Sequence, residues 1–196
     1  AILAGSPGLA GAAILSGRAA EMSGAGYVSL TVPADIYAAV LEAAPSLLSA
    51  PLPEEPLEQG TIGAAQLDFW KQRLESCDAA LVGPGMGKST PSRPNPNSLV
   101  LAAIAAAPRL VLDADGLNLL AVPETLEAGR AALRTRTQSG LEPAILTPHP
   151  GEFRRLCPEM AAMVEHDRIA CAETLAALTA SVVVLKGAGT VIAFPP

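Results

Sequence analysis

Short apolar strands alternate with helices of small residues along most of this chain. Buried strands are predicted at 2–4, 27–32, 79–82, 110–112, 144–147, 182–185 and 191–194. Helices are predicted at 11–23, 34–43, 64–74, 99–106, 125–134, 150–156 and 168–178. This alternation predicts an α/β fold, with a mainly parallel sheet covered by helices on both faces. Proline-rich stretches at 45–63 and 88–97 are predicted to be loops, as is the polar stretch up to residue 140.

Composition narrows the classes of protein that fit. Half of the 196 residues are hydrophobic and only 3% are aromatic, so the core must be aliphatic and rich in alanine, and the length fits one domain. The net charge of −6 argues against a general nucleic-acid binder, and no segment is long and apolar enough for a membrane span. Cys77, Cys157 and Cys171 form neither a CxxC pair nor a zinc spacing, which favours reduced thiols in a cytoplasmic protein.

Both ends of the chain look cut. The sequence opens inside an apolar run, Ala1-Ile2-Leu3-Ala4, without a starting methionine, and it closes directly after a predicted strand at Phe194-Pro195-Pro196. We therefore expect a single domain over residues 1–196 that is incomplete at both termini.

Two glycine-rich turns follow predicted strands. Gly5-Ser6-Pro7-Gly8-Leu9-Ala10-Gly11-Ala12 lacks the G-x-G-x-x-G spacing of dinucleotide folds, and it is either a tight turn or an anion-binding start of a helix. Gly83-Pro84-Gly85-Met86-Gly87-Lys88-Ser89 is one residue too short for a P-loop, and the prolines after it disfavour the helix that a P-loop needs. The second turn is better interpreted as a glycine-lined wall beneath a flat ligand.

Carboxylates follow the strand predicted at 110–112. Asp113 and Asp115 are two residues apart, and in an extended chain their side chains point to the same side, with Asn118 nearby. Such a pair could hold Mg²⁺ through water. In the alternative interpretation, Asp115 caps the following helix.

Two further segments begin as buried strands and end in polar residues, and together they suggest opposite walls of one phosphate-handling cleft. In Thr147-Pro148-His149-Pro150-Gly151-Glu152, the flanking prolines favour projection of His149 toward a ligand, while Glu152 suits the third helical position and is more structural. In Lys186-Gly187-Ala188-Gly189-Thr190, free backbone N–H groups, the lysine and the threonine suit nucleotide phosphates or ribose, although a simple turn remains the alternative. His166 lies in a polar run and is interpreted as a surface residue.

Taken together, these segments resemble the ADP/ATP-dependent NAD(P)H-hydrate dehydratases, a branch of the ribokinase-like fold. The resemblance rests on their order and content over nearly the whole chain, including Leu112-Asp113-Ala114-Asp115-Gly116-Leu117-Asn118. It implies a three-layer α/β/α sandwich. It also implies a carbon–oxygen lyase of metabolite repair, which phosphorylates the C6 hydroxyl of hydrated NADH or NADPH from ADP or ATP and then eliminates phosphate.

The resemblance also implies roles for individual residues. The hydrated dinucleotide would contact Ala12, the turn from Gly85 to Gly87 and His149, with Asp115 and Asn118 as weaker candidates for substrate or magnesium-water contact. The adenine nucleotide would contact Lys186, Gly187, Ala188, Gly189 and Thr190. Mg²⁺ would accompany the nucleotide, and a homo-oligomer, as a tetramer, is expected.

One family motif has no counterpart here. The family places its base, an aspartate, in a Gly-x-Gly-Asp motif at a helix N-terminus, and residues 1–196 contain no such motif. We therefore expect the catalytic aspartate to lie beyond Pro196. Two alternatives stay open at this point, a ribokinase-like kinase of a small alcohol and a non-catalytic nucleotide-binding protein.

Overall fold

An eight-stranded sheet forms the centre of the computed structural model, which describes residues 1–54, 62–87 and 95–196. The strand order is β3-β2-β1-β4-β5-β6-β7-β8, in which β7 and β8 pair antiparallel and every other neighbouring pair is parallel. The strands are β1 (Ile2–Leu3), β2 (Ser29–Val32), β3 (Leu48–Pro51), β4 (Ala80–Val82), β5 (Leu110–Leu112), β6 (Ile145–Leu146), β7 (Val182–Leu185) and β8 (Val191–Ala193).

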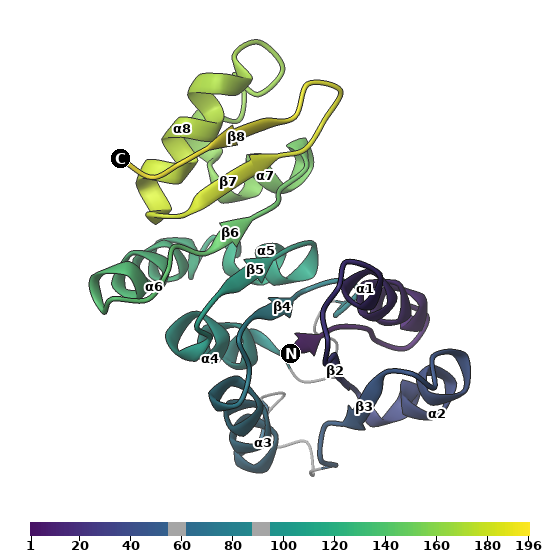
Figure 1. Ribbon diagram of the computed structural model, residues 1–196. Helices are drawn as coiled ribbons and strands as arrows, with labels where there is room; N and C mark the ends of the chain where they lie inside the picture. Colours follow the sequence, from purple (N-terminus) through teal and green to yellow (C-terminus); the bar gives the residue numbers. More distant parts are fainter. Residues whose placement is uncertain (55–61, 88–94) are drawn as a thin grey trace.

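Helices cover both faces of this sheet, as the alternation predicts (Figure 1). Helices α3, α4, α6 and α8 lie on one face, and α1, α2, α5 and α7 on the other. The helices are α1 (Ala10–Met22), α2 (Ala34–Ala43), α3 (Ala64–Glu75), α4 (Asn97–Ala106), α5 (Asp115–Leu120), α6 (Leu126–Gln138), α7 (Pro150–Leu156) and α8 (Arg168–Thr179), with a 3-10 turn at Pro158–Met160. The architecture is the expected three-layer α/β/α sandwich.

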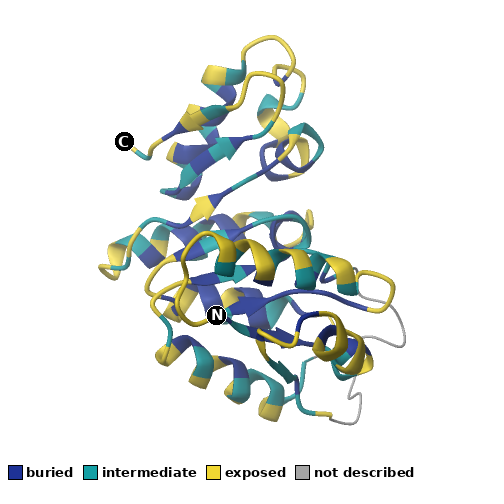
Figure 2. Cartoon of the chain, turned by 45° about the vertical axis from the view of Figure 1, so that its right-hand side comes forward, coloured by how far each residue is buried: buried dark blue, intermediate teal, exposed yellow. Residues whose placement is uncertain are grey.

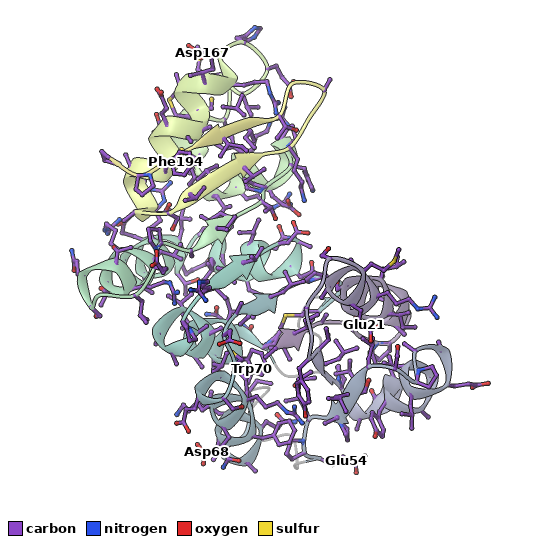
Figure 3. All side chains as sticks on the ribbon, viewed as in Figure 1. Glu21, Glu54, Asp68, Trp70, Asp167 and Phe194 are labelled. Carbon is purple, nitrogen blue, oxygen red and sulfur yellow. The ribbon has the colours of Figure 1, made fainter. Side chains whose placement is uncertain are left out.

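The core is mainly aliphatic, and the exposed residues lie mostly on the outer faces of the helices and in the connecting loops (Figure 2). The strands bury residues such as Leu30, Leu112 and Val183 completely. Trp70 is the largest buried side chain; it points inward from α3, and its indole N–H donates to the Leu99 carbonyl of α4 at 3.1 Å (Figure 3). That bond satisfies the one polar group of a large buried ring.

Two local predictions were wrong, and one short helix had not been predicted. The proline-rich stretch predicted as a loop contains β3, which a terminal proline permits because β3 is an edge strand. A short helix, α5, begins at Asp115, three residues after the last residue of β5, where no helix bounds were predicted. Helix α6 runs to Gln138 rather than ending at residue 134, because Arg136 is buried there and donates to the carbonyls of Ile104, Pro108 and Glu142. Within the predicted loops, residues 55–61 and 88–94 lie outside the described residues.

The three cysteines are free thiols, two of them buried and Cys77 partly exposed, in agreement with the sequence. Across 1–54, 62–87 and 95–196, no helix has the length and apolar character needed to cross a lipid bilayer.

Candidate active site at the carboxyl edge of the sheet

The segments singled out in the sequence come together at one edge of the sheet. Strands β1, β4, β5, β6 and β7 are consecutive parallel neighbours, so their carboxyl ends meet at the same edge. That edge carries the turns after β1 and β4, Asp113 after β5, Thr147 after β6 and Lys186 after β7. In open α/β sheets this edge is where ligands bind.

The two glycine-rich turns contact each other. The backbone N–H of Gly5 donates to the Pro84 carbonyl at 2.8 Å. Gly85 has a φ of +64°, and a Cβ on it would lie 2.7 Å from the Cβ of Ala12 in α1. Ala12 and Gly85 therefore lie side by side, and both positions require small residues.

Gly83 joins the ends of β4 and β5 still more tightly. Its φ is +129°, and an added Cβ would lie 1.8 Å from the backbone carbonyl oxygen of Asp113. Four residues on, the N–H of Gly87 donates to Oδ2 of Asp115 at 2.7 Å. The turn is thereby fixed against β5, whereas Lys88 and Ser89, the rest of the short P-loop-like segment, lie outside the described residues.

Asp113 forms the centre of a polar cluster at the tips of β5, β6 and β7. Its Oδ1 accepts from Nζ of Lys186 at 2.7 Å and from the hydroxyl of Thr147 at 2.8 Å. Both members of the ion pair are partly exposed, with side-chain exposures of 41% for Lys186 and 30% for Asp113. The lysine is thus oriented by a carboxylate and still open to solvent.

Asp113 and Asp115 do not act as the pair that the sequence spacing predicts. The chain is not extended between them, because Ala114 has a φ of 50° and Asp115 is already the first residue of α5. Asp115 accepts from Gly87 and, at 3.2 Å, from the amide of Asn118, whose Oδ1 in turn accepts from Arg155. Asp115 therefore fixes the glycine turn, and the capping position belongs to Ala114.

His149 caps helix α7. Its Nδ1 accepts from the N–H groups of Gly151 at 2.9 Å and Glu152 at 3.4 Å, and Glu152 accepts in return from the His149 N–H at 2.9 Å. This reciprocal arrangement is a capping box in which an imidazole replaces the usual hydroxyl. Glu152 is 4% exposed at the third helical position, as predicted, whereas the imidazole is half exposed.

The segments containing His149 and Lys186 lie side by side rather than opposite each other. Strands β6 and β7 are hydrogen-bonded neighbours, and the N–H of Lys186 donates to the Pro148 carbonyl at 2.8 Å. The prediction of opposite walls was wrong because α8 returns the chain to the position next to β6. The cluster around Asp113 therefore lies at the junction of the two segments.

Sequence reasoning missed two residues of this edge. Thr147 was assigned no role of its own from the sequence, yet its hydroxyl donates to Asp113. Its position between a buried strand and Pro148 could have indicated that it lies at the strand tip. Arg168 was expected only as the first residue of a helix, yet its guanidinium donates to the carbonyls of Leu185, Lys186 and Gly189. No local pattern reveals a contact of this kind, since it spans about twenty residues.

A cavity of about 850 Å³ lies elsewhere, at the amino-terminal edge of the sheet. It is lined by the starts of β1, β2 and β4 together with Arg73 and Cys77 of the α3 end. Because its lining includes none of the strand-tip residues described above, we place the candidate site at the carboxyl edge on its geometry and chemistry.

Comparison with known proteins identifies the family. A family model described as NAD(P)H-hydrate dehydratase matches residues 1–196. The bifunctional NAD(P)H-hydrate repair enzyme of Salinibacter ruber is 37% identical over 196 residues, which are 99% of this chain and 33% of that protein. The chain thus spans about a third of the length of the curated relatives it matches.

Solved structures agree with the fold. The ADP/ATP-dependent NAD(P)H-hydrate dehydratase of Bacillus subtilis, co-crystallised with ATP/Mg²⁺ and soaked with CoA, superposes with a TM-score of 0.67 at 28% identity, covering 99% of this chain and 61% of that one. A ribokinase-like superfamily protein of Enterococcus faecalis superposes with a TM-score of 0.67 at 19% identity over 98% of this chain and 59% of that one. The fold is therefore ribokinase-like, and the chain belongs to the NAD(P)H-hydrate dehydratase family.

Proposed function

We propose that this chain takes part in the nucleotide-dependent dehydration of hydrated NADH and NADPH. Hydroxide is a poor leaving group, so the C6 hydroxyl first receives a phosphoryl group from ADP or ATP while its proton passes to a base. The C6–O bond then breaks as the ring nitrogen lone pair forms a double bond to C6, and phosphate departs with the bonding electrons. Loss of a proton from C5 forms the C5–C6 double bond and restores the reduced nicotinamide. Catalysis of such a transfer is mostly positioning and charge stabilisation.

The observation that carries this proposal is that the segments whose sequences resemble the family meet at one edge of the sheet. The glycine turns, the tip of β5, the His149 cap and the Lys186 hairpin all follow parallel neighbouring strands. We assign hydrated-dinucleotide contacts to Ala12, Gly85, Gly87 and His149, with Asp115 and Asn118 as weaker candidates. We assign nucleotide contacts to Lys186, Gly187, Ala188, Gly189 and Thr190.

Mg²⁺ would arrive with the nucleotide rather than reside in a protein cage. The described residues contain no group of three or more histidine, cysteine or acidic side chains placed to hold a metal ion. Asp113 already accepts from Lys186 and Thr147, and Asp115 from Gly87 and Asn118. Mg²⁺ commonly binds through substrate phosphates and retained waters, which suits this site. We assign the base to no residue of 1–196, and we keep a cytoplasmic homotetramer as an expectation.

A conversion assay on the complete protein tests the proposal. Hydrated NADH is mixed with Mg²⁺ and either ADP or ATP, and recovery of the absorbance of reduced nicotinamide is followed. Recovery that depends on the nucleotide supports the lyase and identifies the donor. Nucleotide binding without recovery would refute it and favour a kinase of another alcohol or a non-catalytic nucleotide-binding protein.

Substitutions test the assignment of the two ligands. His149→Ala should weaken hydrated-dinucleotide binding more than nucleotide binding, and Lys186→Ala should do the reverse. Both are measured as KM for each substrate. Equal effects of the two substitutions on both substrates would contradict the assignment.

A further inference from the structure

The turn between β7 and β8 is held by an arginine from another element. Arg168 is the first residue of α8, and the carboxylate of Asp167 caps that helix by accepting from the Ala170 N–H at 2.9 Å. Figure 3 shows Asp167 at the end of α8 that lies beside the β7–β8 turn. This geometry places the Arg168 side chain within reach of the turn.

The guanidinium of Arg168 binds the carbonyls on both sides of the turn. Its Nη2 donates to the carbonyls of Leu185 and Lys186, each at 2.9 Å, and its Nε donates to the carbonyl of Gly189 at 3.1 Å. A planar fork of N–H donors is suited to such a set of acceptors, and a lysine ammonium is not. Arg168 thus connects the end of β7 to the far side of the turn.

The guanidinium of Arg168 packs directly against Gly187 and fills the space that a side chain at this position would need. An added Cβ would lie 2.6 Å from Nη2 of Arg168 and 3.0 Å from its Cζ. The backbone of Gly187 is outside the left-handed region, so alanine meets no conformational obstacle there. Gly189, in the same turn, has open space around its Cβ direction. A Cβ at 187 would therefore have to displace the guanidinium of Arg168 from its hydrogen bonds to the turn.

Arg168 engages carbonyl groups of the turn, and two backbone N–H groups of the turn are left unpaired among the described residues. Arg168 occupies the carbonyl acceptors, while the N–H groups of Ala188 and Gly189 have no hydrogen-bond partner in the part of the chain that the structure describes. Consecutive free N–H groups beside a cation form a site that suits an anion. We propose that Arg168 is a positioning residue for the nucleotide-binding turn, an inference that rests on the function proposed above.

The test is a double-mutant cycle in the complete protein. Arg168→Ala, Gly187→Ala and the double variant are compared by calorimetric titration with ADP and ATP and by KM for hydrated NADH. Each single substitution should raise the nucleotide Kd about tenfold, or about 1.4 kcal/mol, and change KM for hydrated NADH less than about twofold. The double variant should resemble Arg168→Ala, because the guanidinium that the new methyl group displaces is already gone.

Controls separate positioning from general destabilisation. Arg154→Ala removes an exposed arginine paired with Glu165 and should leave the nucleotide Kd unchanged. Arg168→Lys keeps the positive charge but not the planar fork of donors, so it should restore little of the affinity lost in Arg168→Ala. Hydrogen exchange of residues 183–192 without ligand should be faster in Arg168→Ala and Gly187→Ala than in the native protein, while exchange in α3 stays unchanged.

Two results would overturn the inference. The first is an unchanged nucleotide Kd in Arg168→Ala, and the second is additive effects of Arg168→Ala and Gly187→Ala. Neither depends on turnover. If the native protein binds nucleotide but recovers no NADH, the proposed function fails while the cycle still decides the role of Arg168.

Discussion

Substitution of Gly83 by alanine should disrupt the candidate site by separating the ends of β4 and β5. A Cβ at this position would lie 1.8 Å from the Asp113 carbonyl oxygen and 2.7 Å from the Gly116 nitrogen. Both are backbone atoms, so a rotamer change cannot relieve the contact. Because Asp113 binds Lys186, any shift of its backbone also moves the polar cluster at the strand tips.

The size of the effect follows from two terms. A left-handed backbone with a Cβ costs about 1–2 kcal/mol, and overpacking against rigid atoms costs about 1–3 kcal/mol. Gly83→Ala should therefore reduce the free energy of unfolding by about 2–5 kcal/mol. Gly140 provides a matched control, since its φ is +84° and its Cβ direction meets nothing within 4 Å. Gly140→Ala should cost only the first term, about 1–2 kcal/mol.

Thermal unfolding and activity of the two variants test this reasoning. The melting temperature of the complete protein should fall further in Gly83→Ala than in Gly140→Ala, and only Gly83→Ala should raise KM for hydrated NADH or for the nucleotide. Equal melting temperatures for the two variants would refute the argument that backbone contact with Asp113, rather than backbone conformation alone, requires glycine at 83.

Other perturbations address single groups. His149→Asn should keep the melting temperature close to native, because asparagine also caps helices, whereas His149→Ala should cost about 1 kcal/mol; equal losses would refute the capping role. Arg136→Met leaves three carbonyls without donors and should lower the free energy of unfolding by about 3 kcal/mol, measured in urea, without changing nucleotide Kd. Burial raises the pKa of Cys157 to about 12, so this thiol should resist iodoacetamide at pH 8 until the protein unfolds. The folded state favours the neutral thiol of Cys157. The contribution of this preference to the free energy of unfolding is therefore complete below about pH 9 and is lost as the pH rises toward 12.

The order of strands and helices was predictable from sequence because burial on both faces produces continuous apolar runs. Val182–Leu185 and Leu110–Leu112 are read correctly for this reason, and glycine and proline mark their ends. The same logic predicts which residues stand at the carboxyl edge of the sheet. Position along the chain is thus enough to gather the candidate site, because consecutive parallel strands end on the same side.

Partners within the site were not predictable in the same way. The pairing of Asp113 with Asp115 assumed an extended chain, and the positive φ of Ala114 invalidates that assumption. The polar end of α6 looked like a loop because the carbonyls that Arg136 satisfies come from other segments. Contacts made across the sheet depend on strand order, which periodicity does not encode.

The ion pair of Lys186 and Asp113 affects how the lysine substitution must be interpreted. Because both side chains are partly exposed, the pair contributes little stability by itself, and a bound phosphate could attract the lysine at small cost. Removal of Lys186 alone, however, leaves the Asp113 carboxylate unneutralised at the tips of β5 and β7, where it would repel a phosphate. Lys186→Ala therefore overstates the direct contact of the lysine with nucleotide. The same substitution in an Asp113→Asn background removes that repulsion, and the loss of affinity that persists there belongs to the lysine itself.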